Sequence, residues 1–445
     1  MEDYNHNFKK NLPVDEPVRP RIPSPIVFGR SGDYRKKAYT MNPIRNKALS
    51  ISSVIVAACF SVQAIGVGVY ISYGVFFNPL MAEFGWPRAA ISGSSAVAFF
   101  VSGLVAVYIG RLNDRIGPRI IMSVSALFLG IGCMLMSGMD TIWELYLYFG
   151  LIFGIGLSSI DVIALTTIAR WFPEKRGFMT GITKVGTGAG QLIFPLLASF
   201  LISGFGWRKA GVILGTLALL SLLFIAQFLK KEPDKPGFQN PAGRAALRPD
   251  GNLSFSEARR TFPLWLLCII NLTIVSCLMS ILVHIVPHGR DIGISPHKAA
   301  GVLSAIGGVS MAGRFITGMV IDRIGGKRSM ILSLLLLLTG LFWLQTADSL
   351  WKLYVFACIY GLAHGGFFTV ISPIVAELFG TASHGALFGL VVFFGTAGGA
   401  LGPILTGHLF DISGSYTLPF RLILSVSALG LLLLFLLKPV KPAKI

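Results

Sequence analysis

The sequence predicts an all-α integral membrane protein with twelve transmembrane helices in two six-helix halves. Three observations carry this prediction. First, 53% of the 445 residues are hydrophobic and only 13% are charged, whereas a soluble domain carries about 25% charged residues. Second, apolar runs long enough to cross the ~30 Å hydrocarbon core recur along the chain. Third, a motif in the first half returns in the second half at an offset of 208 residues.

Twelve apolar runs set the expected organisation. They lie near residues 52–78, 89–109, 120–138, 143–168, 178–202, 208–229, 263–287, 299–321, 329–346, 351–376, 385–409 and 419–437. These runs divide the chain into a polar tail (1–47), a first bundle (48–229), a charged linker (230–262), a second bundle (263–437) and a short tail (438–445). The first tail is polar, basic and contains proline, which is typical of disorder.

Positive charge is distributed unevenly between the loops. Of the 38 Lys and Arg residues, 29 fall in the tails and in the loops after even-numbered helices, and seven fall in the opposite loops. Short loops rich in Lys and Arg remain in the cytoplasm. We therefore expect a multi-pass protein of the plasma (inner) membrane with both termini cytoplasmic. The net charge of +18 is then a topology signal, and we expect no nucleic-acid partner.

The repeated motif lies where helices 2 and 8 leave the membrane. Its two copies contain Gly110, Asp114, Arg115, Gly117 and Arg119, and Gly318, Asp322, Arg323 and Gly325. Each aspartate can pair with an arginine or with a neighbouring helix N-terminus. Such a contact can latch the two bundles together, and the simpler interpretation is a tight, basic turn. The motif resembles the signature loop of the major facilitator superfamily, which implies the major facilitator fold.

Further stretches resemble one branch of that superfamily. Residues 74–86, 170–177, 284–293 and 312–318 together resemble bacterial monocarboxylate transporters and the related oxalate/formate antiporters. The resemblance covers nearly all of residues 50–437. It implies a small organic carboxylate as the substrate.

Four positions can be compared with those families residue by residue. Arg314 matches the helix-8 arginine that binds the carboxylate in monocarboxylate transporters, but Ser310 stands where the mammalian branch has an aspartate. Asp291 fits the aspartate that some bacterial relatives have at the outer end of helix 7. The run 385–409 lacks the lysine of the oxalate/formate group, which argues against dicarboxylate exchange.

Three charged residues stand out in the interior of apolar runs, where a centred charge costs ~3 kcal/mol. Asp161 and Lys184 are equally far from the turn between helices 4 and 5, so they lie at the same depth and can form an ion pair. Alternatively, Lys184 binds the substrate anion and Asp161 takes a proton. Arg314 has no acidic residue within one turn of its own helix, and its guanidinium suits a carboxylate. The alternatives are that Arg314 reaches lipid phosphates or pairs with Asp161.

Histidines and tyrosines complete the candidate site. His284 and His364 lie in helices that line the cavity of the resembled fold, and a histidine can carry a proton near neutral pH. The phenols of Tyr73 and Tyr360 are candidate substrate donors. The alternative, purely structural interpretations are a histidine that is hydrogen-bonded to a backbone carbonyl and a tyrosine that anchors the protein at the membrane interface. We expect His384, in the loop between helices 10 and 11, to be solvated.

These features together predict a secondary transporter of a small monocarboxylate, driven by proton symport and working by alternating access. Arg314, Lys184, Tyr73, Tyr360 and His364 are the expected substrate ligands, and Asp291, Asp161 and His284 are the candidate proton carriers. The rivals are an anion exchanger and a membrane sensor that binds a carboxylate without moving it. The sequence shows no ATP motif, metal cluster or catalytic triad, so we expect no enzyme activity, no cofactor and no metal. The expected partners are the carboxylate, protons and membrane lipids, and the expected working form is a monomer.

Overall fold

The computed structural model describes residues 43–232 and 252–438, and every regular element in these ranges is helical. The tail 1–42, most of the linker and residues 439–445 lie outside them. The first half contains α1 (Pro43–Phe84), α2 (Arg88–Ile116), α3 (Pro118–Leu135), η1 (Met136–Gly138), α4 (Ile142–Leu145), η2 (Tyr146–Phe153), α5 (Gly154–Leu157), α6 (Ser159–Trp171) and α7 (Arg176–Ala226). The second half contains α8 (Phe255–Ala258), α9 (Phe262–Asp291), α10 (Pro296–Ile324), α11 (Gly326–Leu344), α12 (Leu350–Phe379), α13 (His384–Ser413) and α14 (Thr417–Leu436).

The twelve predicted spans are present, but two of them lie in one continuous helical stretch. Among the described residues, eleven continuous helical stretches are long and apolar enough to cross a membrane. One of them, the 51-residue α7, holds two predicted spans, because Gly206 at φ 78° breaks the helical geometry inside it. The fourth span runs continuously over Ile142–Trp171 and includes the π-helix η2.

Several helices extend beyond the apolar runs that predicted them. The helix α2 ends at Ile116 rather than near residue 109, and α10 ends at Ile324 rather than near residue 321. Both stop at a glycine with positive φ, Gly117 at 99° and Gly325 at 85°, a conformation that favours glycine. The loop predicted for residues 110–119 is therefore helical up to Ile116, because hydrogen bonding continues the helix through charged residues after the apolar run has ended.

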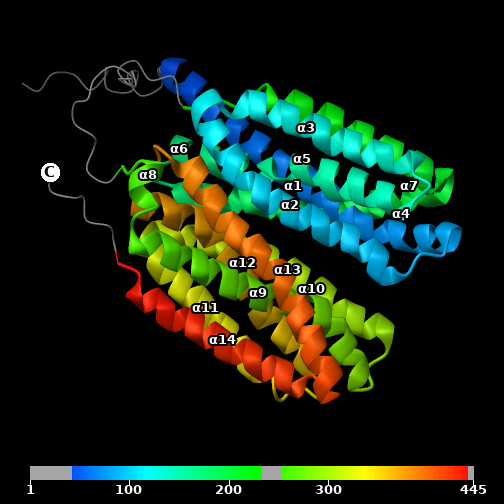
Figure 1. Cartoon of the computed structure of the whole chain (residues 1–445). Coiled ribbons are helices and arrows are strands. Elements are labelled where there is room, and N and C mark those ends of the chain that lie inside the picture. The colour runs from blue at the N-terminus through cyan, green and yellow to red at the C-terminus, as the bar shows by residue number, and fades with distance from the viewer. Residues whose placement is uncertain (1–42, 233–251, 439–445) are drawn as a thin grey trace, which may run out of the picture. The chain divides into compact units, whose positions relative to one another are not determined.

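The two halves contact each other mainly through two helix pairs. The helix α13 packs against α2, and α10 packs against α7. Figure 1 shows the first half (blue to green) and the second half (green to red) as two neighbouring layers of helices. Each half has its own apolar core, although Ala106, Val162 and Leu165 of the first half join the core of the second.

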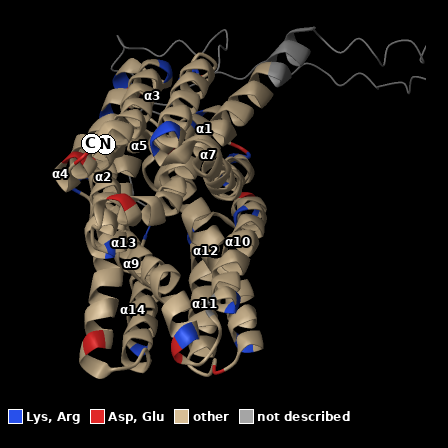
Figure 2. Cartoon of the chain, turned by 90° about the vertical axis from the view of Figure 1, so that its right-hand side faces the viewer, with Lys and Arg blue, Asp and Glu red and all other residues tan. Residues whose placement is uncertain are grey.

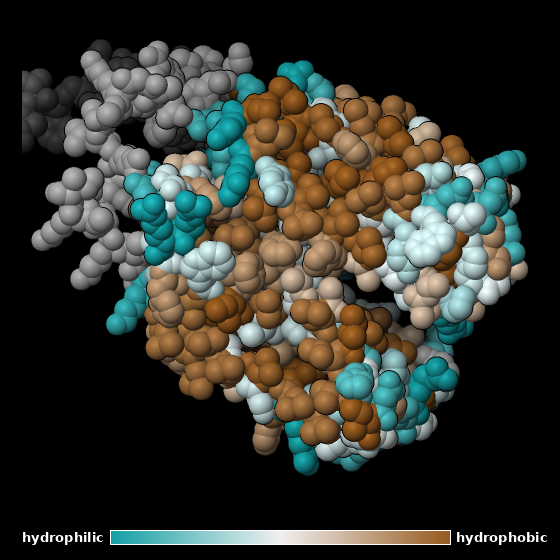
Figure 3. Space-filling model, viewed as in Figure 1, coloured by the Kyte–Doolittle hydropathy of each residue, from teal (hydrophilic) through white to brown (hydrophobic). Residues whose placement is uncertain are grey.

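The outer surface of the bundle matches a lipid environment. Large apolar side chains such as Phe200, Phe224 and Ile404 are 67–72% exposed. In Figure 3 brown apolar side chains cover the middle of the visible face, and teal polar side chains gather toward its two ends. We call the end with the turns at Gly117, Gly325 and Gly380 the basic end, and the end with the turns at Gly206 and Gly414 the opposite end.

Candidate functional site

A polar network links three helices in the middle of the first half. Lys184 Nζ of α7 lies 2.6 Å from Asp161 Oδ1 of α6, so the ion pair that the sequence left as one possibility is present. Gln63 Nε2 of α1 donates to the same oxygen at 2.8 Å. Thr187 donates to Gln63 Oε1 at 2.8 Å. The sequence analysis did not single out Gln63, although a polar amide inside the apolar run 52–78 was a signal for it.

The Asp161 carboxylate opens toward the inside of the bundle. Its side chain is 36% exposed, whereas that of Lys184 is only 6% exposed. Every other residue from Ser158 to Ala169 is buried, because other helices surround α6. The exposed part of Asp161 must therefore face an internal space rather than lipid. Figure 3 shows a hollow between the two halves toward the opposite end.

Arg314 brings a positive charge from the second half to its boundary with the first. The helix α10 approaches α7 closely at glycines: a Cβ added to Gly181 would lie 2.7 Å from the carbonyl oxygen of Arg314. A Cβ added to Gly188 would lie 3.2 Å from Arg314 Nη1. The whole residue is 3% exposed, and its Nε and Nη1 have no hydrogen-bond partner among the described residues. A buried guanidinium without partners is costly, so this position suits an incoming anion.

His364 is the second unsatisfied group near this boundary. Both of its ring nitrogens are buried without a hydrogen-bond partner in the described part of the chain. Its ring packs 5.1 Å from that of Phe368 and 6.0 Å from that of Tyr360. Arg314 interacts electrostatically with His364, Lys184 and Asp161. The structure thus gathers two cations, one carboxylate and one free imidazole from both halves.

The other predicted site residues have their polar atoms engaged or lie elsewhere. Tyr73 donates to the Ile91 carbonyl at 2.9 Å, and Tyr360 donates to the Leu278 carbonyl at 2.5 Å. The two ring nitrogens of His284 lie 2.9 Å from the Tyr416 hydroxyl and 2.9 Å from the Pro403 carbonyl oxygen. Asp291 is the exposed last residue of α9.

At the basic end, the motif aspartates reach across to the other half. Asp114 accepts hydrogen bonds from the backbone N–H groups of Gly385 and Ala386, at 3.1 and 3.0 Å, and pairs with Arg170 at 2.6 Å. Its repeat partner Asp322 accepts from Gly177 and Phe178 at 2.7 and 2.9 Å. Each carboxylate therefore caps the positive N-terminal turn of a helix of the other half.

The remaining motif residues support this geometry. A Cβ added to Gly318 would lie 2.8 Å from the Gly177 carbonyl oxygen, so the close helix approach requires glycine there. Arg119 donates to Gln227 at 2.7 Å. Arg115 and Arg323 extend from the surface.

His384 corrects one prediction. It is fully buried rather than solvated, because α13 begins at this residue and inserts it between α6 and α12. Its Nδ1 lies 3.2 Å from the Thr166 hydroxyl of the first half, and its Nε2 lies 3.0 Å from the Ser372 carbonyl oxygen. His384 is thus a further contact between the halves at the basic end.

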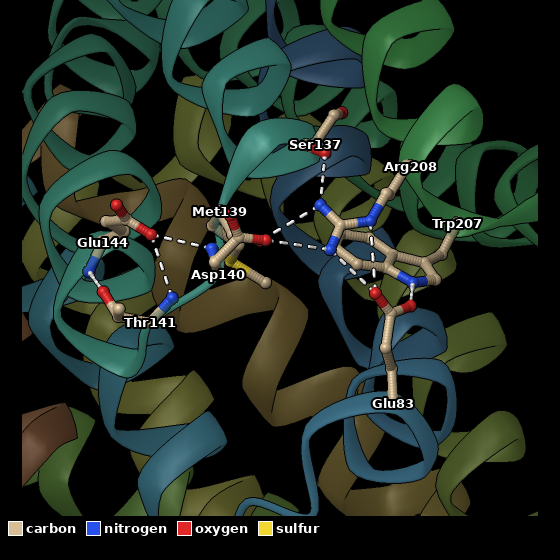
Figure 4. Close-up of polar contacts among 8 residues, drawn as sticks. All are labelled: Glu83, Ser137, Met139, Asp140, Thr141, Glu144, Trp207 and Arg208. Atoms are coloured by element: carbon tan, nitrogen blue, oxygen red, sulfur yellow. Dashed lines mark hydrogen bonds and ion pairs between the residues drawn. The ribbon is translucent and has the colours of Figure 1, made fainter.

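Polar contacts at the opposite end stay within one half. Arg208 donates to Glu83 at 2.7 Å and to the carbonyls of Ser137 and Met139 at 2.9 and 3.0 Å, and Trp207 donates to Glu83 at 2.5 Å (Figure 4). Figure 2, which faces this end, shows charged residues sparsely placed on mostly tan helices. Every hydrogen bond between the halves that we identify among the described residues lies at the basic end.

No group of three His, Cys, Asp or Glu side chains that could hold a metal occurs in residues 43–232 and 252–438.

The chain is similar to known proteins in both sequence and fold. The model of the Major Facilitator Superfamily matches residues 51–320 and 288–445. Monocarboxylate transporter 13 of Rattus norvegicus is 28% identical over 382 residues, which cover 82% of this chain and 84% of the relative. The uncharacterised MFS-type transporter YhjX of Escherichia coli (strain K12) is 25% identical over 331 residues, or 73% and 80% of the two chains. The proton:xylose symporter XylE has a similar fold, with a TM-score of 0.67, 15% identity and coverage of 88% and 97%.

Proposed function

Since the chain belongs to the Major Facilitator Superfamily, and is therefore a multi-pass membrane transporter, we propose that it carries a small monocarboxylate together with a proton. The observation that carries this proposal is Arg314, a buried guanidinium at the boundary of the halves whose Nε and Nη1 have no hydrogen-bond partner among the described residues. A carboxylate matches the planar fork of a guanidinium. Relatives named monocarboxylate transporters, at 25–28% identity, support the same substrate class.

The neighbouring groups suggest how substrate and proton are coupled. A carboxylate bound at Arg314 adds a negative charge beside the Asp161–Lys184 pair. Protonation of Asp161, whose carboxyl opens to the interior, would free Lys184 to help hold the anion. We assign the proton to Asp161 rather than His284, because both nitrogens of His284 are engaged within the second half. His364, with two free ring nitrogens, is our second candidate ligand for the substrate.

The contacts at the two ends support an alternating-access cycle. The basic end joins the halves, so we propose that substrate enters from the opposite end in this conformation. The Lys and Arg distribution supports a cytoplasmic basic end, with both termini inside. Opening the basic end then requires Asp114 and Asp322 to leave the N-terminal turns that they cap. We propose that the plasma (inner) membrane holds the protein as a monomer.

An anion exchanger is the alternative, because Lys184 and Arg314 provide two cations near one another. Uptake of labelled monocarboxylates into proteoliposomes separates the two mechanisms. Symport predicts that an acidic outside drives accumulation in vesicles with no internal substrate. Exchange predicts uptake that requires an internal carboxylate and ignores the pH gradient. A panel in which no carboxylate is taken up under either condition would contradict both.

A further inference from the structure

A cavity of about 610 Å³ lies at the basic end, outside the proposed transport site. Three arginines line it: Arg111 and Arg115 from the last two turns of α2, and Arg259 from the linker just after α8. The second half contributes the turn before α13, including Ser383. The cavity is thus an open one, lined by the first half, the linker and the second half together.

The three arginines of this cavity have no ion-pair partner among the described residues. All three residues are exposed, and the ion pairs of the described ranges involve other residues. The nearby Glu257 carboxylate, outside the lining, accepts hydrogen bonds from Ser254. The one lining carboxylate, Asp114, is already paired with Arg170 and with two backbone N–H groups. Arg111 lies with its guanidinium carbon 4.2 Å above the Phe255 ring, a cation–π contact that orients the side chain.

The internal repeat indicates that a helix end of this kind does not require a cation at the position of Arg111. The counterpart of Arg111 in the second motif is Met319, and the equivalent helix end forms there. Arg115, in contrast, has Arg323 as its counterpart. The cation at residue 111 and the aromatic ring over it therefore belong to the first copy specifically.

Exposed apolar residues follow the two α2 arginines in sequence. Leu112 and Ile116 are 40% and 49% exposed. An amphiphile could therefore place acyl chains against these side chains and its headgroup among the arginines. Arginine clusters bind phosphate through charge-assisted hydrogen bonds.

We propose that this cavity binds a phosphate group, carried by the headgroup of an anionic phospholipid, and that the bound group bridges the two halves at the basic end. A soluble phosphorylated compound shares this chemistry and is the alternative source. The proposal does not depend on the transported substrate.

Binding can be measured on the purified full chain by titration with short-chain phosphatidylglycerol, with phosphatidylcholine as the neutral control. We expect the double variant Arg111→Gln, Arg259→Gln to bind phosphatidylglycerol at least about tenfold more weakly, because charge-assisted hydrogen bonds are lost. The matched control is Arg323→Gln, which removes an exposed arginine of the second motif and should retain wild-type affinity. Equal affinity in all three proteins, or an equal loss in both variants, would overturn the proposal.

A second measurement locates the ligand without removing charge. Ser256→Cys introduces a thiol into the cavity wall, and Glu174→Cys introduces one at the same end outside the cavity, both with Cys358→Ser to remove the exposed native thiol. Phosphatidylglycerol should slow maleimide labelling at residue 256 and leave residue 174 unchanged. Protection by glycerol phosphate but not by phosphatidylglycerol would assign the phosphate to a soluble compound. No selective protection by either ligand would refute the site.

Discussion

The two ends of the bundle use the same kinds of side chain for opposite purposes. At the basic end, Asp114 and Asp322 accept hydrogen bonds from backbone N–H groups of the other half. At the opposite end, Glu83 and Arg208 join helices of the first half only. In the cycle that we propose, the first set would break when the basic end opens, whereas the second could persist throughout. Under this proposal, gating depends on which half the partner belongs to, rather than on the strength of the individual contact.

The largest expected effect concerns the sidedness of the two ends. Single cysteines at residues 88 and 290, which lie at helix ends at the opposite end, should react with an impermeant maleimide from outside intact cells. A cysteine at residue 119, beside the Gly117 turn, should stay unlabelled until the membrane is permeabilised. The reverse pattern would invert the assignment of the basic end to the cytoplasm.

Asp161→Asn tests the network between the two ends. The substitution leaves Lys184, 6% exposed, without its charged partner, and breaking a buried ion pair costs about 3–5 kcal/mol. We expect a lower midpoint of thermal unfolding, and partial recovery when Lys184→Ala is added. A double variant no more stable than Asp161→Asn would count against mutual neutralisation. If the single variant is stable but transports without a pH gradient, the proton assignment is supported.

Asp114→Ala tests the basic end directly. It removes two contacts between the halves and leaves the buried Arg170 unpaired, with an expected loss of up to about 3–5 kcal/mol. Spin labels on the two halves at the basic end should report a larger share of separated distances. Asp322→Ala is the more specific test. Asp322 has no ion pair among the described residues, so this substitution removes only its hydrogen bonds from Gly177 and Phe178. Unchanged distances in both variants would show that the caps do not close this end.

Arg314→Gln should separate binding from folding. The residue has no ion pair with a described residue, so its removal should leave the unfolding temperature near that of the wild type. Carboxylate affinity, measured by ligand-induced thermal stabilisation, should fall roughly ten- to a hundredfold, equivalent to ~1.5–3 kcal/mol. Arg314→Lys keeps the charge but loses the planar fork, so it should also bind weakly. The exposed Arg290→Gln is the control, and wild-type affinity in Arg314→Gln would exclude a substrate role.

The smallest effect is expected at the opposite end. Glu83 and Arg208 are 42% and 38% exposed, and such surface pairs contribute about 0–1 kcal/mol. Glu83→Ala should therefore change stability by less than about 1 kcal/mol and leave the distances between the halves unchanged. A shift of the conformational distribution as large as that of Asp114→Ala would erase the contrast between the ends.

Sequence patterns predicted features that depend on length and spacing along the chain. Apolar runs indicated the twelve spans, the 208-residue offset indicated the two halves, and the symmetry of the helix 4–5 hairpin put Asp161 and Lys184 at the same depth, where they could pair. Features that depend on the rotation of a helix about its axis were not accessible in this way. Tyr73 and Tyr360 remain candidate substrate donors, and the structure adds that each hydroxyl donates to a backbone carbonyl of its own half.

Residues whose environment comes from distant helices were also missed. His384 follows a short polar turn, so its local sequence suggested exposure, whereas α6 and α12 enclose it in the folded chain. Gln63 carries no charge and so did not stand out among ionisable groups, although it completes the hydrogen bonds of Asp161. In both cases the deciding information is the identity of a partner about 100 or more residues away.

The crossing of α7 and α10 has a mechanical consequence. At Gly181 and Gly318 the two helices meet backbone to backbone, and the Ile321 side chain packs on Gly177. Gly177 also donates its N–H to Asp322, so this crossing belongs to the basic end and would separate with it in the proposed cycle. The approach leaves no room for a side chain, since a Cβ added to Gly181 would lie 2.7 Å from the Arg314 carbonyl oxygen. A bulky side chain at Gly181 would hold the two helices apart and should favour the conformation with the basic end open, without unfolding either half.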